Sequence, residues 1–219
     1  MSGTGRLQQA LPAASAGRSV RGDLEACRTT VRSREQSAAL HTLKHRQRRA
    51  TSLAEVYDLA LAAARRPGPG ACGVIVAVDA ERLSAHTGLL TNPSPVSERV
   101  TRQLRIAPII LDASVVRAIE RHRDPSAPDP LEHMLRRRLD LTAPVIGRIR
   151  LDDAVIALLV LDRGSTTTPR ADRPFAQQIA DLTSTAIARI RQSFFTDLTD
   201  TQPPLNHHTD SPLRATALA

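Results

Sequence analysis

The chain has 219 residues, 41% of them hydrophobic, which is enough for one domain with a buried core. Two cysteines cannot build a zinc site alone or a disulfide framework, and 2% aromatic residues argue against stacking platforms for nucleic-acid bases. No apolar run approaches the length of a membrane span, and residues 1–20 lack the hydrophobic core of a signal peptide. We therefore expect a cytoplasmic protein with no membrane contact.

The charge of the chain is basic and unevenly distributed. The net charge is +8, and Lys44 is the only lysine. Residues 1–66 contain twelve Lys and Arg against five Asp and Glu, a net charge of +7, so the excess lies near the N-terminus. The arginines predicted to contact phosphates or an acidic partner are Arg28, Arg32, Arg46, Arg48 and Arg49. The alternative is that these arginines only form the solvent-exposed surface of a helix.

The first part of the chain divides into a tail and a helix. Residues 1–22 are small and basic with no apolar period, which predicts a disordered tail. Asp23 is a plausible N-cap for a polar, arginine-rich helix within residues 23–50. Because its apolar positions are sparse, this helix needs another helix to cover it, either in this chain or in a second copy.

A second helix and a strand open the predicted domain, residues 51–196. Apolar residues from Leu53 to Ala64 line one helix face, and the Pro-Gly segment at 67–70 ends that helix. The apolar run at 72–78 predicts a buried strand, with residues 82–90 as its hairpin partner.

The middle of this domain is less regular. Residues 91–105 give no clear pattern. Residues 106–111 predict an edge strand, because Pro108 lacks the donor that a central strand needs. Two short helices are expected, at 115–122 and around residues 131–139.

The last elements carry the strongest pattern. Residues 145–151 and 155–161 predict a β-hairpin that turns at Asp152 and Asp153, and a long helix capped by Asp172 follows. Residues 197–219 are expected to form a disordered tail. The element order predicts an α+β fold, an antiparallel sheet with the domain's first and last helices packed on one face, preceded by the long basic helix.

Three stretches resemble a GAF domain: LAEVYDLALAAARRPGPGACGVIVAVD, TAPVIGRIRLDDAVIALLVLDRG and DRPFAQQIADLTSTAIARIR. The phrase PIILDASVVRAIERHRDP and the arginine-rich helix further resemble the GAF-containing N-terminal halves of bacterial LuxR-type transcriptional regulators. This resemblance implies a ligand-sensing or regulatory role in signal transduction. In those regulators a helix-turn-helix domain of roughly sixty residues follows, for which residues 197–219 leave no room.

Candidate chemical motifs are few, and each has a structural explanation. The glycines at 68–73 match G-x-G-x-x-G, but the predicted helix precedes them instead of following, which is the wrong order for a phosphate loop. His41 and His45 lack a third metal ligand, and Cys72 heads a buried strand where burial disfavours a thiolate. We therefore expect a protein that is not an enzyme, with no metal site and no cofactor.

A homodimer is predicted from two helices with incompletely covered apolar positions. The expected contacts are Leu24, Cys27 and Val31 of the first helix and Ile187, Ile190 and Phe194 of the last. Packing of the two helices within one chain is the competing interpretation. The function that these patterns favour is a sensory or regulatory module that binds a small molecule or a regulatory protein. The alternative is a protein that uses its basic arm to bind nucleic acid nonspecifically.

Overall fold

The computed structural model describes residues 16–65, 72–79, 82–85, 95–121, 129–162 and 169–200. Its helices are α1 (Ala16–Gln47), α2 (Leu53–Arg65), α3 (Pro95–Ile106), α4 (Ala113–Arg121), α5 (Pro130–Arg138) and α6 (Pro169–Asp200). Its strands are β1 (Cys72–Val78), β2 (Arg82–Ala85), β3 (Ile109–Ile110), β4 (Pro144–Leu151) and β5 (Ala154–Asp162).

The strands form one antiparallel sheet in the order β3-β2-β1-β5-β4. The α+β class is therefore confirmed, and the arrangement is consistent with a GAF-like fold. The predicted hairpin is β4 and β5, and its turn residues Asp152 and Asp153 have φ angles of 49° and 66°. Aspartate tolerates this left-handed conformation better than most residues, which explains the compact turn.

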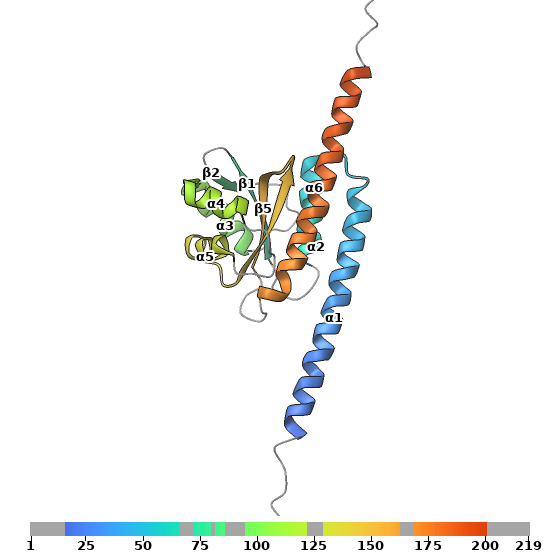
Figure 1. Ribbon diagram of the computed structural model, residues 1–219, viewed down its shortest axis with the longest axis vertical. Helices are drawn as coiled ribbons and strands as arrows, with labels where there is room; N and C mark the ends of the chain where they lie inside the picture. The colour runs from blue at the N-terminus through green and yellow to red at the C-terminus, as the bar shows by residue number, and fades with distance from the viewer. Residues whose placement is uncertain are drawn as a thin grey trace, which may run out of the picture.

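Helices cover both faces of the sheet, so the molecule has three layers (Figure 1). α1, α2 and α6 lie on one face, and α3, α4 and α5 lie on the other. Alternating residues of β5 supply both cores: Leu159 packs towards the first group of helices and Leu158 towards the second, and neither is exposed. The prediction that the domain's first and last helices share one face is confirmed by the packing of α2 against α6.

Several predicted boundaries were wrong. α1 begins at Ala16, before the expected cap at Asp23, because aspartate inside a helix costs only a modest amount of propensity. α6 runs from Pro169 to Asp200, longer at both ends than predicted. Residues 95–106, in the stretch left unassigned, form α3, and the edge strand is confirmed but is only two residues long. The predicted break at 67–70 and the outer parts of both tails, 1–15 and 201–219, lie outside the described residues.

α1 and α6 run side by side in the same direction and extend past opposite ends of the domain (Figure 1). The N-terminal part of α1, blue in the figure, projects from one end, and the C-terminal part of α6, red, projects from the other. Each helix has 32 residues, which corresponds to a length of about 48 Å. Among the described elements, these two helices reach farthest from the sheet.

Candidate functional site

A pocket of about 530 Å³ opens between α4 and the adjoining ends of the sheet. Its apolar lining consists of Val78, Leu111, Val116, Ile119, Ala154 and Val155, and its polar lining consists of Glu120, Arg150 and Asp153. The carboxylate-bearing residues Glu120 and Asp153 are exposed, whereas Arg150 is partly buried. The volume lies within the range of small-molecule sites in proteins.

A β-bulge shapes the sheet side of this pocket. The pairing of β4 with β5 shifts register between Ile149 and Arg150, so Ile156 of β5 has no partner of its own. Such an insertion bends the strand and re-aims neighbouring side chains. The result is that Val155 faces the pocket on the same side of the sheet as Leu158.

The pocket wall, α4, is capped at its N-terminus by Asp112. The Asp112 carboxylate accepts hydrogen bonds from the backbone N–H groups of Ser114 (2.8 Å) and Val115 (2.9 Å) and from the Ser114 hydroxyl. The hydroxyl bond, followed by the two backbone bonds, lowers the pKa of Asp112 because each stabilises the charged form. Asp112 therefore remains a charged cap under neutral conditions.

Two arginines of β4 hold the C-terminal end of the same helix. Arg148 donates from Nε to the carbonyl of Ile119 (2.7 Å) and from Nη2 to the carbonyl of Ala118 (2.9 Å). Arg150 donates to the carbonyl of Glu120 at 3.4 Å. The last carbonyls of a helix have no partner inside it and carry the negative end of its dipole, so cationic donors suit them well.

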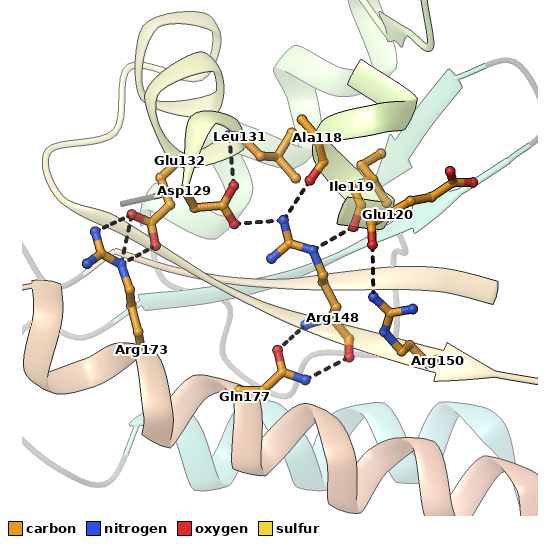
Figure 2. A network of polar contacts seen from close by, with 10 residues as sticks. All are labelled: Ala118, Ile119, Glu120, Asp129, Leu131, Glu132, Arg148, Arg150, Arg173 and Gln177. Atoms are coloured by element: carbon orange, nitrogen blue, oxygen red, sulfur yellow. Dashed lines mark hydrogen bonds and ion pairs between the residues drawn. The ribbon is translucent and has the colours of Figure 1, made fainter. Parts of the chain in front are cut away.

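Arg148 also joins α4 to α5 through a buried ion pair (Figure 2). Its Nη2 lies 2.7 Å from Oδ2 of Asp129, and the side chains are only 3% and 2% exposed. The other oxygen of Asp129 accepts from the N–H of Leu131 at 2.9 Å and caps α5. Arg148 alternates with apolar residues along β4, and it is buried under these two helices.

β4 is an edge strand of the sheet, and side chains of α6 bond to its backbone. Gln177 accepts from the backbone N–H of Arg148 at 3.0 Å and donates to its carbonyl at 3.2 Å, so the side-chain amide takes the place of a neighbouring strand. Ser184 accepts from the backbone N–H of Arg150 at 2.8 Å. The close approach depends on Gly147, where an added Cβ would lie 2.4 Å from the carbonyl oxygen of Ala176.

A second ion pair links α6 directly to α5. Arg173 contacts both oxygens of Glu132, with Nη2 at 2.6 Å from Oε2, and both side chains are largely buried (Figure 2). Hydrogen bonding to Glu132 raises the pKa of Arg173 by stabilising its charged form. α5 is therefore tied to β4 and to α6 by separate charged contacts.

Polar contacts fasten the C-terminal half of α1, and the residues just after it, to α6. Arg32 pairs with the fully buried Asp172 at 2.5 Å. Gln47 donates to the hydroxyl of Thr183 at 3.2 Å. Arg189 donates to the carbonyl of Gln47 (3.0 Å), the last residue of α1, and to that of Ala50 (2.5 Å), three residues further along the chain. Arg32, predicted to contact an external anion, thus has an acidic partner inside the molecule.

The predicted dimer contacts fall into two groups. Ile187 and Ile190 are each only 7% exposed, because they pack in the core of their own chain, as the competing interpretation held. Cys27, Val31 and Phe194 are exposed, the latter two at 49% and 61%. Leu24 and Arg28 lie on α1, but their side chains are outside the described part of the structure.

The remaining candidate residues lie on the surface. Arg46, Arg48 and Arg49 are exposed at the end of α1, together with His41 and His45. Within the described ranges no group of three or more His, Cys, Asp or Glu side chains is placed to bind a metal ion. Among those same residues no helix is long and apolar enough to cross a membrane.

A scan against models of protein families and a search of curated proteins both find no match. Among solved structures, the crystal structure of a methyl-accepting chemotaxis protein, residues 122 to 287, resembles this chain with 19% sequence identity and a TM-score of 0.42. That match covers 69% of this chain and 98% of the other. A likeness at this level does not assign the chain to a family.

Proposed function

We propose that this protein is a non-catalytic sensory or regulatory module acting in transcriptional or signalling control. In this proposal a small molecule binds in the pocket beside α4, and its presence is transmitted through β4 to α6. The observation that carries it is the double role of Arg148 and Arg150. Their side chains hold the end of the pocket wall, and their backbone N–H groups are held by α6.

The lining of the pocket defines the kind of ligand expected. Six of its nine lining residues are apolar, which favours a ligand with a hydrophobic part. Glu120, Arg150 and Asp153 provide the charged groups of the lining, which would orient a polar end of the ligand. A ligand that moves the C-terminal end of α4 also moves the carbonyls of Ile119 and Ala118, and with them Arg148, which donates to them at 2.7 Å and 2.9 Å.

Transmission requires that the ligand bind two arrangements of α6 with different affinity. α6 and α1 are suited to carry such a change, because both project from the domain (Figure 1).

The homodimer remains part of this proposal, with the exposed Cys27, Val31 and Phe194 as its contacts in place of the buried isoleucines. Sedimentation at several protein concentrations tests it: Val31→Glu is expected to weaken the dimer, and a wild-type monomer at tens of micromolar in moderate salt would contradict it.

The ligand site is tested by native mass spectrometry of the freshly purified full chain, followed by a thermal-shift screen of metabolites. Val116→Phe fills the pocket, whereas Arg117→Phe places the same ring on the exposed side of α4 and serves as the control. We expect ligand-induced stabilisation to disappear in the first variant and to persist in the second. Equal behaviour of the two variants, or no stabilising compound at all, would contradict the ligand site.

Transmission is tested separately by hydrogen–deuterium exchange of α6 with and without the ligand found in that screen. Gln177→Ala removes the side chain that bonds to the β4 backbone but lies outside the pocket lining. It is expected to leave ligand affinity within about twofold of wild type and to abolish the ligand's effect on α6 exchange. An unchanged exchange response would show that the signal does not travel through this contact.

A further inference from the structure

The C-terminal end of α1 and the residues just after it carry a concentration of positive charge, with four cations within residues 44–49. Six arginines of the described structure pair with acids, namely Arg32, Arg82, Arg99, Arg148, Arg173 and Arg191, whereas others, such as Arg102 and Arg105 of α3, are exposed outside these pairs. Lys44, Arg46, Arg48 and Arg49 are exposed, and no described carboxylate lies within ion-pair distance of them. The mutual repulsion of these charges is uncompensated within the described residues, which favours an anionic partner.

A groove of about 170 Å³ lies directly beside these cations, between α1 and α6. Its apolar part is formed by Leu182 and Ala186 of α6. Lys44 and Arg48 stand on the α1 side, and Arg189 stands on the α6 side. Arg189 bonds to the carbonyl of Gln47, the last residue of α1, and to that of Ala50 just after it, so the two helices are held together beside the groove.

The size and lining of the groove indicate its occupant. Its volume is below the range of roughly 300 to 1,000 Å³ typical of small-molecule sites, but it suits one apolar side chain anchored at an interface. A nucleic-acid backbone would use the cations and leave the apolar surface uncovered. A protein segment with a hydrophobic residue between acidic ones would use both features.

We infer that the groove between α1 and α6 is a docking site for an acidic segment of a partner protein. The segment inserts one leucine- or phenylalanine-sized side chain against Leu182 and Ala186. Its flanking carboxylates pair with Lys44 and Arg48, and further acids reach Arg46 or Arg49. This site shares no lining residue with the pocket beside α4, so the two proposals can be tested independently.

The test uses the full chain and a fluorescent synthetic helix composed of glutamate with leucine at every third or fourth position, followed by fluorescence anisotropy. Lys44→Glu/Arg48→Glu is expected to weaken binding at least about tenfold. The control is Arg102→Glu/Arg105→Glu on α3, which changes the net charge equally at two exposed arginines and is expected to stay within about twofold. A second probe with serine in place of leucine, at the same charge, is expected to bind much more weakly than the first.

Three results would overturn the inference. The first is absence of binding by the leucine probe at about 1 mM, which is weaker than functional docking. The second is an equal loss in the two double variants, or equal binding of the leucine and serine probes, which would indicate attraction by net charge alone. The third is tighter binding of a random DNA duplex than of the helix, lost in Lys44→Glu/Arg48→Glu, which would assign these cations to nucleic acid. Thermal melts of both double variants verify that each remains folded.

Discussion

Replacing Arg148 by methionine tests the charged centre that joins the pocket wall to the rest of the domain. The change keeps an unbranched apolar side chain and removes the guanidinium. It leaves Asp129, only 2% exposed, without its cation, and it removes the donors to the carbonyls of Ala118 and Ile119. Loss of one partner of a buried ion pair costs about 3 to 5 kcal/mol. Since domains of this size are stable by about 5 to 15 kcal/mol, the variant is expected to fold but to lose much of its stability.

The assay is urea denaturation followed by circular dichroism, with Arg99→Met as the matched control. Arg99 pairs with Asp140 on the surface, where the side chains are 43% and 83% exposed, so its loss is expected to cost no more than about 1 kcal/mol. In the double variant Arg148→Met/Asp129→Asn the orphaned charge is gone, and part of the lost stability should return. A cost below about 1 kcal/mol for Arg148→Met, equal to that of the control, would refute the assignment of a buried charged centre.

Three further predictions concern stability. Gly147→Ala is expected to lower the free energy of unfolding, measured by urea denaturation, by about 1 to 3 kcal/mol, because the new Cβ would lie 2.4 Å from the carbonyl oxygen of Ala176. An unchanged midpoint would show that α6 is free to move away from β4. Leu159→Ala empties a fully buried position and is expected to cost roughly 2 to 5 kcal/mol, whereas an unaltered melting temperature would contradict the central placement of β5. Asp112→Ala should destabilise the protein at neutral pH. Because folding lowers the pKa of Asp112 from its ordinary value of 3.8, this difference from wild type should be complete above pH 3.8 and should shrink as the pH falls through the lower pKa of the folded state; a constant difference between about pH 6 and about pH 2 would contradict a charged cap.

The candidate site was only partly predictable. The short helix expected at residues 115–122 corresponds to α4. Arg148 and Arg150 are two residues apart in β4, so they lie on the same side of the strand. Their burial was not predicted, because an arginine in an alternating strand is ordinarily on a solvated face. Only the docking of α4 and α5 on that face turns the positions into an internal site. No local pattern marked Gln177 as the residue that bonds to the β4 backbone, since its partner is 29 residues away.

The sequence by itself determined the class of the fold and its most regular pieces. Period-two runs, turn-forming aspartates and the long apolar stripe of the last helix are local features, so the β4–β5 hairpin and α6 could be predicted from them. Whether Ile187 and Ile190 are covered by α1 of the same chain or by another copy was decided only by tertiary packing. The same holds for Arg32, whose partner Asp172 is 140 residues distant. A buried apolar side chain needs others to pack against, and a buried charge needs an opposite charge or hydrogen bonds. Only the path of the chain in space determines which residues are close enough to provide them.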